Sequence, residues 1–131
     1  MSTQIKNHPL QKLIELEIDA RDFGFEWPDS HMILEQIRSE CDEVEEVLTN
    51  KQTHARLQEE VGDLLHAVIS LCQFLNFNTE EILGQTTKKF DERIKALKQI
   101  TQQKGLQNLK DQPINVLLEM WALAKKKEQN E

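Results

Sequence analysis

The sequence predicts an all-α protein, a helical bundle of about five helices. Apolar residues recur every three or four positions along most of the chain, which is the spacing of one face of an α-helix. Only four glycines and three prolines interrupt its 131 residues, so the chain has few of the turns that connect strands. The length and the share of 38% hydrophobic residues predict one domain over residues 1–131.

The first helix is expected to begin at Pro9 and to end near Gly24. Proline suits the first helical turn, because the amide hydrogens of that turn have no partner inside the helix. Residues 25–30 form a loop, since Pro28 cannot continue a helix and restrains the residue before it, Trp27.

The second helix is expected to follow a cap at Asp29 or Ser30 and to reach about Thr49. A turn at residues 50–53 then leads into the third helix, over about residues 53–74. Each of these helices carries one apolar stripe. On the third helix, the stripe expected to face the core consists of Leu57, Val61, Leu64, Leu65, Val68, Leu71, Cys72 and Leu75.

The fourth helix is expected to start at a capping box formed by Asn78 and Glu81, and to run to about Gln103. The dipeptide Lys104-Gly105 marks its end. After a loop, Pro113 is a suitable first residue for the last helix of the bundle.

Two pairs of carboxylates stand on the second and third predicted helices. They are Glu40 with Glu43, and Glu60 with Asp63. Residues three apart share one face of a helix, so each pair points in one direction. The stretch between the pairs is long enough to end one helix and to start an antiparallel one, which lets all four carboxylates converge. Glu40 also falls inside the apolar arc of its helix, where a carboxylate needs a partner.

A metal ion is the expected partner, since four converging carboxylates otherwise repel one another. Oxygen ligands alone suit Mg²⁺, Mn²⁺ or Ca²⁺ better than zinc. Each acidic pair taken alone is common by chance on an acidic helix. A di-iron site is not indicated, because such bundles need a carboxylate-x-x-His unit twice and Asp63-x-x-His66 has no second copy. His66 is therefore expected to be an exposed residue.

Two further pairs stand four residues apart, so each shares a helix face; they are Lys89 with Arg93 and Trp121 with Lys125. Lysine and arginine can contact the phosphate oxygens of a metal-bound ligand, or they can form a solvated face. Trp121 also fits the apolar stripe of the last helix, which makes core packing its alternative role. Trp27 lies in a loop, where it can stack on a base or fill a gap between helices.

The net charge of −7 argues against binding to a nucleic-acid polymer, which needs a basic face. It does not exclude a small polyphosphate that carries its own magnesium. The chain has no run of about 18 apolar residues and no signal-peptide core near its first residues, so we expect no membrane span and a cytoplasmic location. Cys41 and Cys72 lie on apolar arcs and are expected to be buried thiols rather than a disulfide.

Together these motifs resemble the MazG-type nucleoside triphosphate pyrophosphohydrolases, all-α enzymes related to the dimeric dUTPases. The resemblance covers about residues 21–125 and includes the stretch EEVGDLLHAVISL and Gly24-x-x-Trp27 before the first acidic helix. The family often has Glu-Glu-x-x-Glu, and the first of these positions is Ser39 here, which leaves four acidic ligands. The four motifs, in order, are Glu40-x-x-Glu43, Glu60-x-x-Asp63, Lys89-x-x-x-Arg93 and Trp121-x-x-x-Lys125.

The resemblance implies a hydrolase, dependent on Mg²⁺ or Mn²⁺, that cleaves a nucleoside triphosphate between the α and β phosphates to give the monophosphate and pyrophosphate. It implies a homodimer or homotetramer. The implied metal ligands and catalytic residues are Glu40, Glu43, Glu60 and Asp63, with one of them or Glu59 orienting the attacking water. The implied substrate-binding residues are Lys89, Arg93 and Lys125 for the phosphates, Trp121 for the nucleoside end, and Trp27.

Two other functions stay open. The chain can be a non-catalytic homologue that senses nucleotides, or a helical protein-interaction module whose acidic residues are solvated. Titration with Mg²⁺ and nucleotide separates the interaction module from the other two functions, and release of pyrophosphate separates the enzyme from the sensor.

Overall fold

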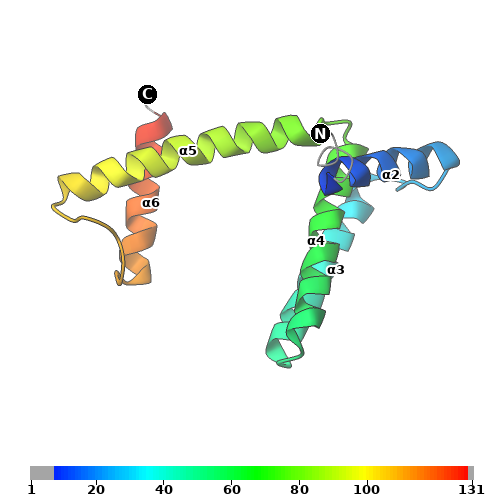
Figure 1. The fold of residues 1–131 in the computed structure, drawn as a ribbon, viewed down its shortest axis with the longest axis horizontal. Coiled ribbons are helices and arrows are strands. Elements are labelled where there is room, and N and C mark those ends of the chain that lie inside the picture. Colours follow the sequence, from blue (N-terminus) through cyan, green and yellow to red (C-terminus); the bar gives the residue numbers. More distant parts are fainter. Residues whose placement is uncertain (1–7, 130–131) are drawn as a thin grey trace. The chain divides into compact units, whose positions relative to one another are not determined.

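The computed structural model describes residues 8–129, and within this range it contains five helices and no strand, which confirms the predicted all-α class (Figure 1). The observed helix bounds lie within one or two residues of the predicted ones, because the signals that start and stop these helices are local. The helices are α2 (Pro9–Phe23), α3 (Ser30–Thr49), α4 (His54–Phe74), α5 (Thr79–Gln103) and α6 (Ile114–Gln129).

Side-chain caps fix the beginnings of the two helices that carry the carboxylate pairs. Oδ1 of Asp29 accepts a hydrogen bond from the amide of Met32 at 2.9 Å, so Asp29 caps α3 and Ser30 is its first residue. Oγ1 of Thr53 accepts a hydrogen bond from the amide of Arg56 at 3.2 Å and caps α4. Each cap satisfies an amide that the helix itself leaves unpaired.

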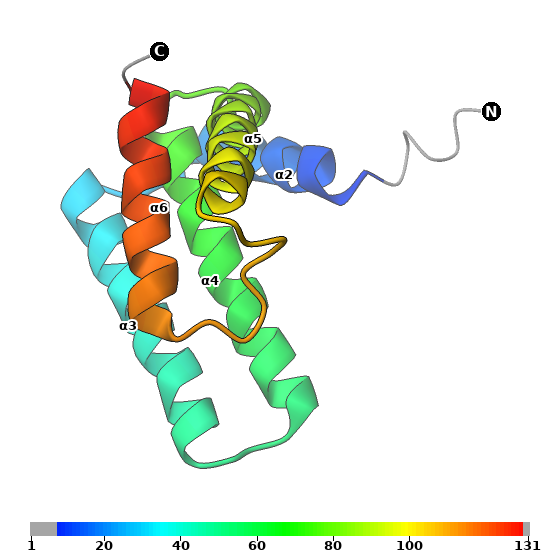
Figure 2. The same cartoon turned by 90° about the vertical axis from the view of Figure 1, so that its left-hand side faces the viewer.

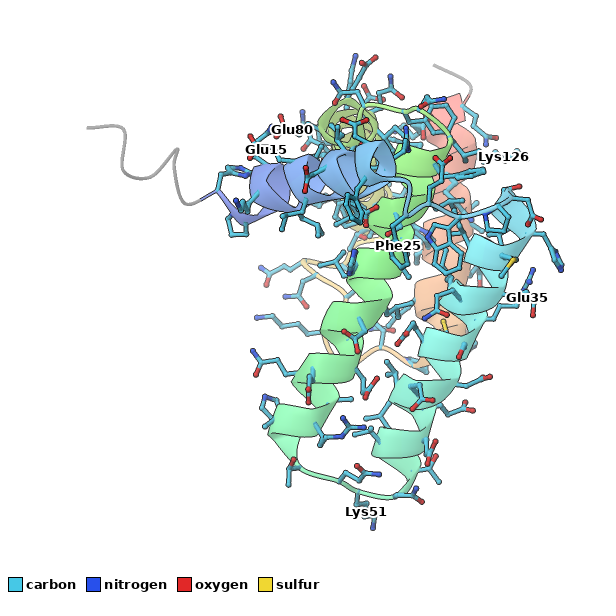
Figure 3. All side chains as sticks on the ribbon, turned by 90° about the vertical axis from the view of Figure 1, so that its right-hand side faces the viewer. Glu15, Phe25, Glu35, Lys51, Glu80 and Lys126 are labelled. Atoms are coloured by element: carbon cyan, nitrogen blue, oxygen red, sulfur yellow. The ribbon has the colours of Figure 1, made fainter. Side chains whose placement is uncertain are left out.

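The chain divides into two compact units, the first ending at Thr79 and the second beginning at Glu80. In the first unit, α3 and α4 form an antiparallel hairpin whose connecting turn contains Lys51 (Figures 2 and 3). Ile33 and Val47 of α3 form part of its core, with 0% and 2% of their surface exposed. The organisation of residues 1–131 as one domain stays a prediction.

The third helix of the first unit, α2, packs against the C-terminal part of α4. The guanidinium of Arg21 donates hydrogen bonds to the carbonyl oxygen of Gln73 and to Oδ1 of Asn76, the latter at 3.2 Å. Gly24 ends α2 with a φ of 103°, a left-handed conformation that glycine adopts without strain. These features hold the loop that carries Trp27 beside α4.

The second unit holds α6 and all of α5 except its first residue. Nε of Arg93 donates a hydrogen bond to Oε1 of Glu128 at 2.8 Å, and both side chains are about four-fifths buried. The rings of Phe90 and Trp121 are tilted by 59° with centroids 6.0 Å apart, which is a favourable aromatic arrangement. The core of this unit consists of Ala96, Ile100, Met120 and Ala124, with Leu97, Leu109, Val116 and Trp121 packed against them.

The apolar stripe of α4 packs only in part within the first unit, where Leu57, Leu64, Leu71 and Cys72 are half-buried. Val61, Leu65 and Val68 are 47%, 61% and 41% exposed. Residues outside the stripe are more deeply buried than these, because periodicity shows where a stripe lies around its helix but not which surface covers it. The buried residues of α4 are Glu60, Ala67, Ile69 and Ser70.

For the two cysteines, the structure confirms that both thiols are free but not that both are buried. Both are free thiols, as expected, and Cys72 is half-buried. Cys41 is exposed, so its predicted burial is wrong: a position on the apolar arc of α3 does not by itself ensure cover by another element. Among residues 8–129, every helix is too short or too polar to span a membrane.

Candidate metal centre

Three carboxylates converge between α3 and α4. They come from Glu40 on α3 and from Glu60 and Asp63 on α4, and one ligand oxygen from each lies within 4.8 Å of the others. The hairpin produces this convergence, because α3 and α4 lie side by side along their length (Figure 3). Glu60 is buried, Glu40 is half-buried and Asp63 is exposed, so the cluster opens to solvent on one side.

The donor set fits a hard divalent cation. All three groups offer oxygen, and neither imidazole nor thiolate belongs to the cluster. Mg²⁺ and Ca²⁺ bind oxygen at about 2.0–2.6 Å, so ligand oxygens on opposite sides of such an ion lie roughly 4–5 Å apart. Mutual separations within 4.8 Å therefore allow all three residues to bind one ion without a change of backbone.

Glu43, the fourth predicted ligand, lies about one turn beyond Glu40 on α3 and is exposed. Its carboxylate is not among the three that converge. The role of Glu43 as a metal ligand stays a prediction. Its exposed side chain can adopt other rotamers, because packing does not confine it.

Two polar side chains orient the less exposed carboxylates, and neither was found from the sequence. Nε2 of Gln36 donates a hydrogen bond to Oε1 of Glu40 at 2.6 Å, and Nη2 of Arg56 pairs with Oε1 of Glu60 at 2.8 Å. Each donor stands four residues before its carboxylate on the same helix, which is the spacing that brings side chains into contact. That spacing is the sequence signal that indicates both.

A cavity of about 470 Å³ lies in the same unit, beside the loop that follows α2. Its walls include the aromatic rings of Phe25, Trp27 and Phe74. Ser70 also lines the cavity and stands seven residues after Asp63, so the two share one face of α4 about 10 Å apart along the helix axis. The cavity therefore continues the face of α4 that carries the carboxylate cluster.

The polar part of this cavity centres on Glu17 of α2. Its Oε1 accepts a hydrogen bond from Oγ of Ser70 at 2.6 Å and lies 2.7 Å from Nε2 of His66. His66 is exposed, as predicted, with 53% of its side chain accessible, yet it has a specific partner. Glu17 was missed, although it occupies the apolar stripe of its helix, which is the same signal that singled out Glu40.

The remaining predicted residues belong to the second unit. Lys89 and Lys125 are exposed. Arg93 is not part of a solvated face, since it pairs with Glu128. Trp121 is half-buried against the core of that unit, so the packing role that was its alternative is observed. Their contacts with substrate stay predictions.

This chain is similar to a known protein family and to proteins of Thermotoga maritima and Escherichia coli. Residues 29–97 match the MazG family, described as the MazG nucleotide pyrophosphohydrolase domain. The chain is 36% identical over 110 residues to a nucleoside triphosphate pyrophosphohydrolase/pyrophosphatase MazG of Thermotoga maritima, over 84% of this chain and 41% of that protein. It is 27% identical over 120 residues to a nucleoside triphosphate pyrophosphohydrolase of Escherichia coli, over 91% of this chain and 45% of that protein. The chain thus spans less than half the length of these relatives.

Proposed function

Because the chain belongs to the MazG family, we propose that it hydrolyses a nucleoside triphosphate between the α and β phosphates, giving the nucleoside monophosphate and pyrophosphate, with Mg²⁺ or Mn²⁺ as cofactor. The observation that carries this proposal is the convergence of Glu40, Glu60 and Asp63 between α3 and α4. The names of the relatives describe the same class of reaction.

Glu40, Glu60 and Asp63 would hold the divalent cation, and Glu43, exposed on α3, would be a fourth ligand. When bound, the cation would neutralise charge of the triphosphate and activate a water molecule. The protein contributes positioning: Gln36 keeps the Glu40 carboxylate in place through its hydrogen bond. Glu59, which is 67% exposed next to the cluster, is available to orient the attacking water.

In the reaction, the oxygen of water attacks the α-phosphorus, and the water loses a proton to the orienting carboxylate. The bond from the α-phosphorus to the oxygen that bridges the α and β phosphates breaks, and pyrophosphate leaves. The excess negative charge of the triphosphate attracts Lys89, Arg93 and Lys125, which we assign to the phosphates. Positioning and charge stabilisation account for most of the catalysis of this kind of reaction.

We assign the nucleoside end of the substrate to the cavity beside Trp27. The aromatic walls of the cavity suit a planar base, and Glu17 offers a carboxylate acceptor at its polar end. The cavity lies about two helical turns from Asp63, a distance comparable with the length of a nucleotide. Trp121 is the other candidate for the nucleoside end, from the second unit.

Measuring products tests the enzymatic function directly. With Mg²⁺ and each common or damaged nucleoside triphosphate, we expect equal amounts of monophosphate and pyrophosphate, and no product when a chelator replaces the metal. Binding of nucleotide without any product would indicate a sensor. Failure of both Mg²⁺ and nucleotide to bind in a calorimetric titration would leave the interaction module as the function.

We also propose that the protein forms a homodimer or homotetramer through the exposed stripe of α4. Val61, Leu65 and Val68 stand at helical spacing and are 41–61% exposed, which is unusual for one face of an isolated helical unit. A second copy of the chain would cover this face with its own α4 stripe, since most oligomers are symmetric and pair the same surface of two subunits.

The expected result of sedimentation at micromolar concentration is a species of twice or four times the chain mass of 15.3 kDa. Leu65→Glu should shift the protein toward the monomer without unfolding it, because Leu65 is 61% exposed in the single chain. Leu118→Glu is the matched control, on a residue that is 62% exposed in α6. A wild-type monomer, or an assembly that Leu65→Glu leaves intact, contradicts the proposed interface.

A further inference from the structure

Arg56 is a cation aimed at a ligand of the candidate metal centre. It lies in the first turn of α4, and its Nη2 is 2.8 Å from Oε1 of Glu60. Its Nη1 lies 3.5 Å from Oε2 of Glu59. The Arg56 side chain is 46% exposed, whereas the Glu60 side chain is only 9% exposed. The guanidinium therefore sits at the mouth of the cluster, between the buried carboxylate and solvent.

Helix stability does not explain a cation at this position. The first turn of a helix carries the positive end of the helix dipole, where acidic side chains are favoured and basic ones are disfavoured. An arginine four residues before a glutamate is also the weaker orientation of such a pair. The shortest side-chain contact of Arg56 is instead with a carboxylate of the converging group, which is a candidate metal ligand.

We propose that Arg56 and the divalent cation compete for the Glu60 carboxylate, and that Arg56, once displaced, contacts the phosphate oxygens of the bound triphosphate. This inference rests on the proposed metal-dependent function. The same Glu60 carboxylate pairs with Arg56 through Oε1 and belongs to the converging group that would hold the metal. A displaced guanidinium is half exposed beside the place where the triphosphate meets the metal, and its planar fork matches phosphate geometry.

This exchange predicts opposite shifts of two affinities when Arg56 is neutralised. The metal alone should bind more tightly, because both a competitor and a repelling charge are removed. The metal-bound triphosphate should bind more weakly, because one phosphate contact is lost. A residue that only supports the helix cannot produce opposite shifts, since weakening the site would lower both affinities together.

The test compares Arg56→Gln with Arg38→Gln by calorimetry on the full chain. Arg38 is a matched control, because it is 63% exposed on α3 and its partner at 2.7 Å is Glu35, outside the cluster. The first titration uses Mn²⁺ alone, and the second uses an α,β-methylene nucleoside triphosphate, which is not cleaved, at saturating Mn²⁺. Thermal melting of each variant confirms that it is folded.

For Arg56→Gln, relative to the control, we expect Mn²⁺ alone to bind about 30-fold more tightly, the effect of removing one unit charge roughly 4 Å from a divalent ion in water-like surroundings. We expect the analogue to bind about tenfold more weakly, the typical loss of one charged hydrogen bond. Arg56→Lys, which keeps the charge but not the fork, should restore the Mn²⁺ affinity and only part of the analogue affinity.

Three other outcomes would contradict the proposal, each at a different step. If wild-type protein binds Mn²⁺ but Arg56→Gln binds it no more tightly than Arg38→Gln does, the competition is wrong and the metal-dependent function stands. If the analogue affinity of Arg56→Gln equals that of the control, the phosphate contact is wrong. If wild-type protein binds no Mn²⁺, the metal-dependent function fails, and the inference fails with it.

Discussion

Asp63→Asn is expected to lower kcat by about 10²–10³-fold, while the protein stays folded. The change replaces a carboxylate of the converging group by a neutral amide, which is a poor ligand for a hard cation. The loss falls on charge that develops during cleavage, so kcat and kcat/KM should fall together. Asp63 is exposed, and the nearly isosteric amide leaves the packing of α4 unchanged. The measurement is the steady-state rate of pyrophosphate release at saturating Mg²⁺.

Asp42→Asn is the control for this experiment, because it makes the same chemical change at an exposed position of α3 outside the cluster. A melting curve with and without millimolar Mg²⁺ adds a readout that does not depend on turnover, since a cation that binds only the folded protein raises Tm. Wild type and Asp42→Asn should show this increase, and Glu40→Gln should lose most of it. If Asp63→Asn keeps a kcat within threefold of that of the control, the cluster is not the catalytic metal site.

Trp27→Ala is expected to raise KM about tenfold or more and to leave kcat close to that of the wild type. The ring lines the cavity of the first unit, and stacking of a base on an aromatic ring is worth about 1–3 kcal/mol in nucleic-acid sites. Removal of an interaction that is equal in the ground state and in the transition state changes KM alone. Trp27 is half-buried in a loop, so we expect a smaller loss of Tm than from a core position.

Trp121→Ala is the comparison for Trp27→Ala, with the same loss of an indole ring. The Trp121 ring packs against the core of the second unit and against Phe90, so the variant should lower Tm by opening a cavity that costs about 3 kcal/mol. An additional rise in KM for the folded fraction would place the nucleoside end at Trp121. An unchanged KM for Trp27→Ala would remove the cavity of the first unit from the substrate site. Both constants and the melting curve are needed from the same preparations.

The sequence by itself determined the helical class, the helix bounds and the candidate ligands, because each of these depends on neighbours a few residues away. Asp29 caps α3 through an amide three residues on, and Gly24 ends α2 through its own backbone freedom. Glu40 stood out as a carboxylate in an apolar arc, and the structure places it with Glu60 and Asp63. Spacing along one helix is enough for such predictions.

Only the tertiary structure decided which faces meet. The wheel of α4 showed its apolar stripe but not that Leu65 is exposed while Glu60 is buried. The packing of α2 against α4 also brought Glu17 to Ser70, and these residues are far apart in the chain. The physical reason is that periodicity fixes only the directions of side chains around one helix axis. The rotation and offset of a helix against its neighbour depend on how the side chains of the two helices interlock. An offset of one turn moves a side chain by about 5.4 Å along the axis.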